Sequence, residues 1–403
     1  MFTNEFIQQA AAEVHDYVIE MRREMHKRAE VAPNCVRAGT FIREQLDAMG
    51  IPWEPVETHG CFATLDSGRP GPHIGLRADF DALPMPEDEC NLSQKRIVMS
   101  DTPDKTCHGC GHDAHTAMLL GAAKILSANM DKFDGIIYLA FEDGEENGTG
   151  WPGMEKVLKT KQIDTFWGIH VWADLPSGTI CVQEGPRMAG GIGVDITFVG
   201  KGGHGSRPDQ SANPVFMAAN YLNNLAVAWA NQIDANETVT LGITSIQGGE
   251  VSNVIPDTAH VIGSCRLFNV EEGKKAFNIL KTVAENTAAM HNGHVEFGPR
   301  FMMFGGPVVN DSYYAALAEA ALPEVLGAGA VVKSQPWYAS ESFGRYLSMS
   351  PGVFAHLGIN NPAKGTGAAH HNSKFDVDED VLDMGVKATL KYVATVLEKG
   401  IKH

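Results

Sequence analysis

Short apolar runs that alternate with a helix-like stretch restrict the fold of this chain more than any other feature of its sequence. Three such runs are 73–77, 135–141 and 166–169, and the stretch 116–126 between two of them has the apolar spacing of a helix. Runs of this kind are typical of strands that are buried on both faces of a sheet. We therefore expect an α/β domain with a mixed, mostly parallel sheet flanked by helices.

The N-terminal part of the chain is predicted to be helical. Residues 13–28 place their apolar side chains on one helical face, and residues 38–49 repeat the pattern. We therefore expect a pair of helices within residues 5–49, before the first strand of the sheet.

The pattern changes after Gly185. Residues 193–199 alternate between apolar and polar side chains, as in a half-exposed strand. The elements expected from there on are strand 193–199, helix 213–232, strands 237–246 and 258–268, helix 270–291 and strand 294–297. This β-α-β-β-α-β order is the ferredoxin-like arrangement. We predict an inserted α+β domain at 187–299 and a discontinuous first domain at 1–186 and 300–403, whose last segment returns to the first sheet.

Length and charge restrict the setting of the protein. A chain of 403 residues suits two domains, because single cores stop growing at roughly 250–300 residues. No apolar run approaches the ~20 residues of a membrane span, and the first residues do not have the pattern of a secretory signal. A net charge of −17 disfavours nucleic acid as a partner. The seven scattered cysteines, an odd number, favour a reducing compartment, so we expect a cytoplasmic protein.

Residues 107–115 are the densest group of chemically active side chains, with two cysteines, three histidines and one aspartate. Thiolate and imidazole are good ligands for zinc and similar metals. A Cys-x-x-Cys pair also occurs in zinc ribbons and in redox sites. A ribbon needs a second such pair, which the sequence lacks, and a redox pair usually belongs to a small thioredoxin-like unit. The segment on its own therefore favours a metal site.

Ligand-type side chains also follow the predicted strands. They are Asp79 and Asp81 after the first strand, Glu145 and Glu146 in an acidic turn after the second, His170 at the third, and the pair His370-His371 in a glycine-rich loop. Each position alone has an ordinary explanation, such as a solvated turn or a core histidine. In open α/β sheets, however, the chemistry gathers beyond the carboxyl ends of the strands. Their recurrence at such ends indicates one shared site.

Seven short segments, spread over most of the chain, resemble one known family. They are 77–84, 110–113, 145–146, 168–172, 200–204, 253–257, and His371 with Phe375 four residues later. In this order they resemble the aminoacylase and carboxypeptidase-like metallohydrolases. The similarity is to the amidohydrolase branch, which includes hippurate hydrolase, indole-acetyl-amino-acid hydrolases and N-acetyldiaminopimelate deacetylase.

The resemblance implies a site for two divalent metal ions. The implied ligands are Cys110, His112, Glu146, His170 and His371. Glu145 would be the general base and acid. Asp81 would bind one of the metal ligands and fix its orientation, without contacting the metal itself. Such a donor set suits zinc or manganese and also accepts cobalt and nickel.

The resemblance also assigns roles within the inserted domain. His204 would reach the active site of the partner subunit and stabilise the oxyanion. Asn253 and Arg266 would hold the substrate, and Arg266 suits its carboxylate through a two-pronged hydrogen bond. These roles imply a homodimer or a dimer-based oligomer, in which the inserted domain is both a lid and a dimerisation domain.

The implied activity is hydrolysis of the amide bond of N-acyl amino acids by a metal-activated water. A dipeptidase or carboxypeptidase with the same ions is an alternative, which differs only in the acyl side of the scissile bond. A non-catalytic metal-binding interaction protein is another alternative, but the presence of Glu145 beside all five implied ligands argues against it. Ferredoxin-like domains also bind RNA, and the acidic charge disfavours that function here.

Three positions depart from the usual family pattern. Cys107 stands where methionine is common, so an extra thiol that could pair oxidatively with Cys110 lies near the site. Residues 141–144 replace a more usual Phe-Gln-Pro-Ala and add two carboxylates, which would disfavour an acidic substrate group unless they face the other way. Ala29 replaces a common proline. These departures concern the choice of substrate more than the mechanism.

Overall fold

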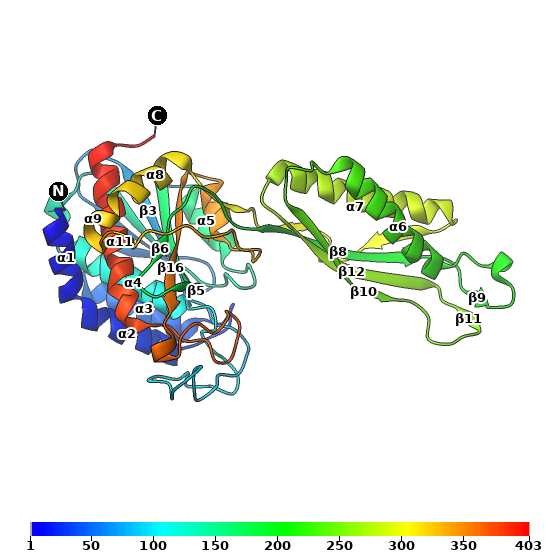
Figure 1. Ribbon diagram of the computed structural model, residues 1–403, viewed down its shortest axis with the longest axis horizontal. Coiled ribbons are helices and arrows are strands. Elements are labelled where there is room, and N and C mark those ends of the chain that lie inside the picture. Colours follow the sequence, from blue (N-terminus) through cyan, green and yellow to red (C-terminus); the bar gives the residue numbers. More distant parts are fainter. Residues whose placement is uncertain (1, 403) are drawn as a thin grey trace. The chain divides into compact units, whose positions relative to one another are not determined.

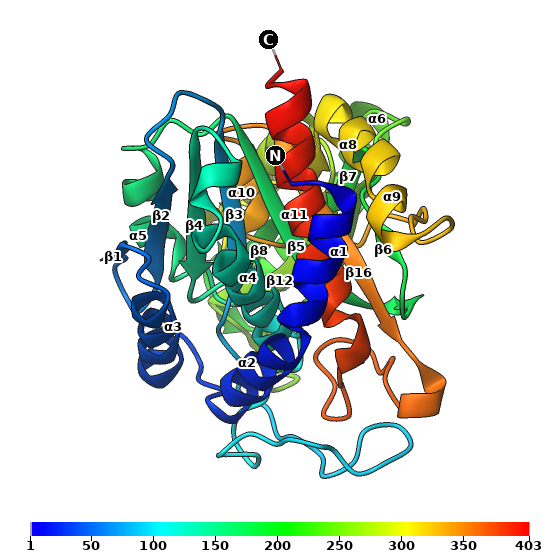
Figure 2. The ribbon, with the colours of Figure 1, turned by 90° about the vertical axis from the view of Figure 1, so that its left-hand side faces the viewer.

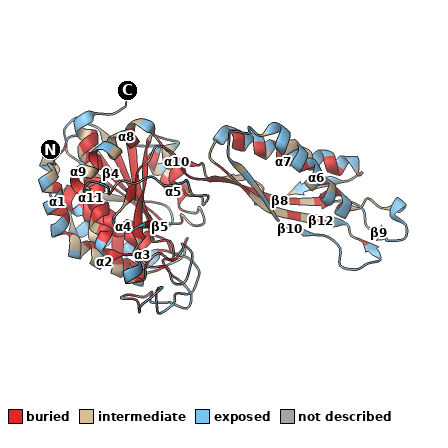
Figure 3. Cartoon of the chain, viewed as in Figure 1, coloured by how far each residue is buried: buried red, intermediate tan, exposed pale blue. Residues whose placement is uncertain are grey.

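The computed structural model describes residues 2–402, which form two compact units. The first unit consists of Met1–Gly185, Val309–Gln335 and Tyr346–His403, and the second of Pro186–Val308 and Pro336–Arg345. The second unit therefore takes in more of the chain than the predicted domain at 187–299. Buried side chains form a separate core in each unit (Figure 3).

A seven-stranded sheet is the centre of the first unit, with the strand order β1-β2-β4-β3-β5-β16-β6 (Figure 2). The strands are β1 (Trp53–Pro55), β2 (Cys61–Asp66), β3 (His73–Asp79), β4 (Ile136–Glu142), β5 (Thr165–Pro176), β6 (Ile180–Cys181) and β16 (Gly352–Asn360). The four central strands β4, β3, β5 and β16 are parallel, and the outer pairings are antiparallel. The predicted α/β class, with a last segment that returns to the first sheet, is confirmed.

Helices pack against this sheet and against each other (Figure 1). They are α1 (Asn4–Glu13), α2 (His15–Lys27), α3 (Val36–Ala48), α4 (His112–Ser127), α5 (Trp151–Leu158), α8 (Ser312–Ala321), α9 (Pro323–Leu326) and α11 (Leu382–Lys399). The short elements α10 (Phe343–Leu347), β7 (Gly185–Met188) and β15 (Val308–Asn310) lie where the chain passes from one unit to the other. Single helical turns occur at η1 (Met130–Lys132), η3 (Pro362–Lys364) and η4 (Glu379–Val381).

The predicted helix pair at the N-terminus is three helices in the structure. A separate α1 precedes α2, and the two helices meet at Val14. The hydroxyl of Thr3 accepts a hydrogen bond from the Phe6 amide and so caps α1, a signal that apolar spacing alone does not show.

Helix α4 is almost entirely buried, and it carries part of the Cys/His cluster. All of its sixteen residues except Lys124 and Ser127 are buried, because α4 packs against α2, α11 and strands β3 and β5. It begins at His112, four residues before the predicted start. The first turn is polar, so the apolar spacing that predicts a helix begins only after it.

The second unit has its own sheet, with the order β10-β12-β8-β13 and a short β14 paired with β8. The strands are β8 (Gly190–Val199), β10 (Val239–Gln247), β12 (Thr258–Leu267), β13 (His294–Phe297) and β14 (Met303–Phe304), and the helices are α6 (Pro214–Gln232) and α7 (Val270–Met290). A small two-stranded antiparallel sheet pairs β9 (Gly203–His204) with β11 (Val254–Ile255), and η2 (Pro208–Gln210) follows β9. The β-α-β-β-α-β order is the ferredoxin-like arrangement.

Gly121 gives a test of how closely α4 packs. A Cβ at this position would lie 2.5 Å from Val18 Cγ2 of α2 and 3.0 Å from Val386 Cγ2 of α11. We expect Gly121→Val to lower the free energy of unfolding by about 1–3 kcal/mol, because overpacking in a dense core forces its neighbours apart. Urea denaturation followed by circular dichroism measures the change.

The matched control is Gln8→Val, which adds the same side chain at an exposed position of α1. It should change the stability by only a few tenths of a kcal/mol. A Gly121→Val variant as stable as the wild type would contradict the close packing of the three helices.

Candidate metal centre

The parallel register brings the ends of three strands to one edge of the first sheet. Asp79 at the end of β3 pairs with Glu142 at the end of β4, and Arg77 of β3 pairs with Gly168 of β5. His170 therefore lies two residues beyond the last pairing between β3 and β5. Residues that follow these strands are close in space although they are far apart in the sequence.

The turn before α4 places Cys110 and His112 at this edge. Gly111 between them has a left-handed conformation with φ of 90°. A Cβ at Gly111 would lie 2.3 Å from Cγ2 of Val171, so a glycine is required both by the backbone conformation and by the close approach to β5.

His170 completes a first group of donor atoms with these two residues. Its Nε2 lies 3.5 Å from Cys110 Sγ, while its Nδ1 donates a hydrogen bond of 2.6 Å to the carbonyl oxygen of Val171. The second contact fixes the ring so that Nε2 is directed to Cys110. The ligand atoms of Cys110, His112 and His170 all lie within 4.8 Å of one another.

The acidic turn after β4 supplies a second group. One carboxylate oxygen of Asp81 accepts a hydrogen bond from the Glu145 amide at 3.0 Å, and the other accepts from the Glu146 amide at 3.2 Å. The Asp81 carboxylate also lies 3.4 Å from His112 Nδ1. Asp81 thus connects the turn to His112.

Glu146 and His371 face each other beside Cys110. Glu146 Oε1 lies 3.4 Å from His371 Nε2 and 3.7 Å from His112 Nε2. The ligand atoms of Cys110, Glu146 and His371 form one group within 4.8 Å, and those of His112, Glu145 and Glu146 form another. The structure therefore brings together all five residues that the sequence nominated as ligands, with Glu145 beside them.

Buried donor atoms that lack a hydrogen-bond partner indicate that these residues fit a cation. Among the described residues, neither ring nitrogen of His112 has a hydrogen-bond partner, and neither does Glu146 Oε1, although all three atoms are buried. Buried polar atoms without partners are rare because they have lost the hydration that stabilises them. A donor set of one thiolate, three imidazoles and a carboxylate is the kind that binds zinc, manganese and similar ions.

The charges around the site also favour a cation. Burial raises the pKa of the Cys110 thiol well above its usual value, and Glu146 adds to the shift. Burial has the opposite effect on His112, but Asp79 and Asp81 beside it hold the pKa of its ring well above the usual value. The site therefore retains protons where a metal needs deprotonated ligands. Protons and metal compete for it, and acid favours release of the metal.

Two histidines near the site, His115 and His370, were not among the ligands that the sequence nominated. Nδ1 of His115 lies 2.6 Å from the Asp79 carboxylate, and its Nε2 accepts a hydrogen bond of 2.9 Å from the Val171 amide, so His115 ties α4 to β3 and β5. His370 Nε2 accepts from the Ala173 amide at 3.2 Å, and its Nδ1 lies 3.9 Å from Cys110 Sγ. The sequence placed these histidines in the dense Cys/His segment and in the His370-His371 pair. Only the structure shows that their rings contact the protein backbone or Asp79.

The two extra carboxylates of the acidic turn do not belong to any of these donor groups. Glu142 accepts hydrogen bonds from Arg77 at 2.9 Å and from the Tyr346 hydroxyl at 2.9 Å. Asp143 accepts from the Thr58 hydroxyl at 2.6 Å and from the His59 amide at 2.8 Å. Both are buried and committed to structural contacts. They are therefore no reason to exclude an acidic substrate group.

Cys107 is also buried, and its backbone forms a bridge with Leu83. Burial, with a further contribution from Glu87, raises the pKa of its thiol to about 12. Cys107 and Cys110 are both free thiols. A protonated, buried thiol is a poor nucleophile, so Cys107 is less reactive towards disulfides than an exposed cysteine.

The candidate residues of the second unit lie in two places. His204 of β9 pairs with Val254 of β11, and the Gly205 amide donates a hydrogen bond of 2.8 Å to the Asn253 carbonyl, so His204 and Asn253 are neighbours at this two-stranded sheet. Arg266 lies near the far end of β12, opposite Gly191 of β8, with its guanidinium 5.4 Å from the ring centre of Phe304. Eight residues of strand separate it from the start of β12, or about 26 Å. Within this unit, Arg266 is therefore apart from the other two.

Comparison with known proteins identifies the class. Residues 75–395 match the family described as peptidase family M20/M25/M40, so the chain belongs to this family. It is a hydrolase by that membership. The resemblance to aminoacylase and carboxypeptidase-like metallohydrolases that the sequence motifs indicated is confirmed.

Individual relatives cover nearly the whole chain. Thermostable carboxypeptidase 2 of Saccharolobus solfataricus is 32% identical over 384 residues, which are 93% of this chain and 94% of that protein. N-acetylcysteine deacetylase of Bacillus subtilis is 31% identical over 392 residues, 95% of this chain and 98% of that protein. The crystal structure of a dinuclear metal-binding peptidase of the M20 family from Bacillus subtilis aligns with a TM-score of 0.81 at 28% identity. That alignment covers 96% of this chain and 99% of the other.

In the described residues of this chain, no helix has the length and apolar character needed to cross a membrane.

Asp81→Asn tests the contact between the acidic turn and His112. An amide nitrogen would then face one of the two backbone N–H groups that Asp81 now accepts from. We expect metal affinity to fall by about 10- to 100-fold, as is typical when a group that orients a ligand is lost. Competition with a chromogenic chelator measures the affinity. The matched control is Asp131→Asn, an exposed position on η1. Wild-type affinity in Asp81→Asn would show that the contact has no influence on the site.

Proposed function

We propose that this protein hydrolyses the amide bond of N-acyl amino acids with the help of two divalent metal ions. The ligands in this proposal are Cys110, His112, Glu146, His170 and His371. The observation that carries it is the group of donors beside Glu145, in which Cys110, His112 and His170 are buried and atoms of His112 and Glu146 have no hydrogen-bond partner. The similarity to N-acetylcysteine deacetylase supports an N-acyl amino acid as the substrate.

The ions, when bound, supply Lewis acidity that lowers the pKa of water towards ~7 and polarises the scissile carbonyl. Glu145 takes a proton from the attacking water on its carboxylate. It then delivers this proton to the nitrogen of the leaving amine, so that one side chain serves as base and acid in turn. Asp81 holds the backbone of the turn at Glu145 through the amide of that residue.

Residues of the second unit complete the proposed mechanism. His204 donates a hydrogen bond to the tetrahedral oxyanion in the active site of the partner subunit, a contact whose loss typically costs about 10²- to 10³-fold in rate. Asn253 and Arg266 bind the substrate, and the planar guanidinium of Arg266 suits the carboxylate of the amino acid. Zinc or manganese is the proposed metal, and the same donors accept cobalt and nickel.

The experiment that tests this function is an assay of the metal-loaded enzyme with a panel of N-acetyl and N-benzoyl amino acids, in which release of the free amine is measured. We expect hydrolysis by the wild type, with loss of activity after chelation. Glu145→Gln should bind both ions and lose about 10²- to 10⁴-fold in kcat, because general acid–base catalysis contributes that much. Metal content measured on the same sample separates loss of the base from loss of the ions.

Absence of turnover by the wild type on the whole panel would contradict the proposed activity. Turnover by Glu145→Gln at the wild-type rate would contradict the assignment of Glu145 as the general base. A dipeptidase or carboxypeptidase with the same ions is the second candidate, favoured by the 32% identity to thermostable carboxypeptidase 2. Cleavage of dipeptides in preference to N-acetyl and N-benzoyl amino acids would select it. Uptake of metal without turnover of either class would instead indicate a non-catalytic binding protein.

The second unit has a surface that supports the proposed homodimer. Helix α6 contains no charged residue, and Val215, Phe216 and Val227 expose 40%, 63% and 65% of their surface. Phe216 and Val227 lie on one side of the helix together with Ala219, Asn223 and Ala230. An uncharged, partly apolar helix face is typical of a surface that another protein covers.

Phe216→Glu tests this interface. We expect the wild type to have the mass of a dimer in light scattering after size-exclusion chromatography. The variant should dissociate to the mass of a monomer, because a charge would be buried without a partner. Gln232→Glu adds the same charge at an exposed position on another side of α6 and should leave the dimer intact. A monomeric wild type, or a dimeric Phe216→Glu variant, would contradict the assignment.

The cysteines bear on the compartment. All seven are free thiols, and six of them are buried. Free thiols persist where the surroundings are reducing, which supports the proposed cytoplasmic location.

A further inference from the structure

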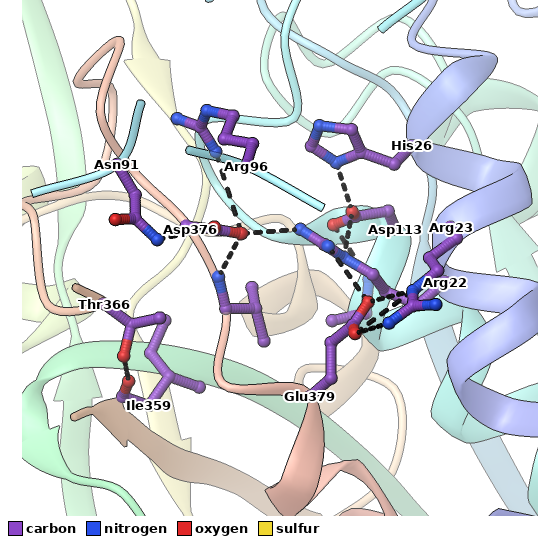
Figure 4. Close-up of polar contacts among 12 residues, drawn as sticks. Arg22, Arg23, His26, Asn91, Arg96, Asp113, Ile359, Thr366, Asp376 and Glu379 are labelled. Atoms are coloured by element: carbon purple, nitrogen blue, oxygen red, sulfur yellow. Dashed lines mark hydrogen bonds and ion pairs between the residues drawn. The ribbon is translucent and has the colours of Figure 1, made fainter. Parts of the chain in front are cut away.

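A largely buried ionic network includes Asp113, the residue after the candidate ligand His112, and Arg22 of α2 is at its centre (Figure 4). The Arg22 side chain is only 3% exposed. Its Nε lies 2.9 Å from the Asp113 carboxylate, one terminal nitrogen lies 3.1 Å from Asp376, and the other lies 3.3 Å from Glu379. One guanidinium thus contacts three carboxylates from two distant parts of the chain.

Two of these carboxylates belong to the segments that carry candidate ligands. Asp113 follows His112 directly at the start of α4, and Asp376 lies five residues after His371. The backbone also connects the two segments, since the His371 amide donates a hydrogen bond of 2.8 Å to the Gly109 carbonyl. Arg22 therefore links the Cys110–Asp113 turn to the loop of His371.

A second path runs from the same turn through His26. Its Nδ1 lies 2.7 Å from Asp113 and its Nε2 lies 2.6 Å from Glu87. A carboxylate only accepts hydrogen bonds, so both ring nitrogens of His26 donate and the ring carries a positive charge. Arg96 lies 3.6 Å from Glu87 and donates a hydrogen bond of 2.8 Å to the carbonyl of Ser373, two residues after His371.

The network is balanced in charge, which argues for a positioning role. Its positive members are Arg22, Arg23, Arg96 and protonated His26, and its negative members are Glu87, Asp113, Asp376 and Glu379. A cavity of 250 Å³ borders part of it, lined by Arg22, Arg23, Asp376 and Glu379 among others. These four side chains already pair with each other or with their neighbours, and the cavity is also lined by Lys95, Lys364 and Asp380.

We propose that Arg22 is a positioning residue, which holds the Cys110–Asp113 turn and the His371 loop at the separation that metal binding requires. This inference rests on the metal site of the proposed function. The ion pairs that the structure describes for Arg22 are with Asp113, Asp376 and Glu379, none of which is a candidate ligand. Arg22 acts through Asp113 and Asp376, each of which is fixed to the backbone of a ligand-bearing segment.

The test is metal affinity in variants of the full-length protein. Apo protein is titrated with Co²⁺ at a temperature at which circular dichroism shows every variant to be folded. The visible absorption of Co²⁺ depends on coordination number and geometry, so it reports a change in the site directly. We expect Arg22→Met to weaken the binding of at least one ion by about 10- to 100-fold and to alter the spectrum.

Arg23→Met is the matched control. Arg23 is the next residue of the same helix and shares Glu379 with Arg22, but its side chain is 37% exposed and, among the described residues, it forms no ion pair with Asp113 or Asp376. We expect this variant to bind Co²⁺ within about twofold of the wild type. Wild-type affinity and spectrum in a folded Arg22→Met variant would overturn the inference, and so would an equal loss in both variants.

Two further variants decide the matter if apo Arg22→Met does not fold. Arg22→Lys keeps the charge but cannot pair with three carboxylates at once, and Asp376→Asn weakens only the link to the His371 loop. Both should weaken Co²⁺ binding, and wild-type affinity in both would overturn the inference. Where Arg22→Met folds, the double variant Arg22→Met/Asp376→Asn should bind no more weakly than Arg22→Met alone, because the two residues act as one link.

These measurements distinguish the inference from the function on which it rests. If the wild type takes up two ions per chain and the variants bind them equally well, Arg22 has no positioning role and the proposed function is unaffected. If the wild type takes up no ions, both the role of Arg22 and the proposed metal-dependent function are contradicted.

Discussion

The parallel register of β3, β4 and β5 is the constraint on which the rest of the structure depends. Because Asp79 pairs with Glu142 and Arg77 pairs with Gly168, the residues that follow these strands lie at one edge of the sheet. Cys110 and His112 reach the same edge because Gly111 allows the turn before α4 to approach Val171 closely. No single segment forms the site. It exists only when the sheet is complete, so the free energy of folding also assembles the donors.

Much of this arrangement could be predicted from the sequence. The apolar runs predicted β3, β4 and β5, and the change of pattern after Gly185 predicted the order of elements in the second unit. The motifs nominated five ligands, and the structure brings these residues together. Each prediction relied on local periodicity, or on side chains whose chemistry is recognisable over a few residues. Their roles stay predictions until metal binding is measured.

Other features could not be predicted because they depend on contacts between distant residues. The first turn of α4 is polar, so apolar spacing did not show where the helix begins. The carboxylates of Glu142 and Asp143 looked like part of the site, and only the positions of Arg77 and Thr58 show that they have structural partners. The pair of Arg22 and Asp376 is separated by more than 350 residues, and no local pattern connects them.

The way in which Asp81 holds the acidic turn has a consequence for how such a site can change. Asp81 accepts hydrogen bonds from the main-chain amides of residues 145 and 146, and any amino acid other than proline supplies such an amide. The backbone of the turn is thus held in place whichever side chains occupy positions 145 and 146. Mutation can exchange those groups one at a time while the loop keeps its course, so new reactivity can be sampled on this framework without first rebuilding it.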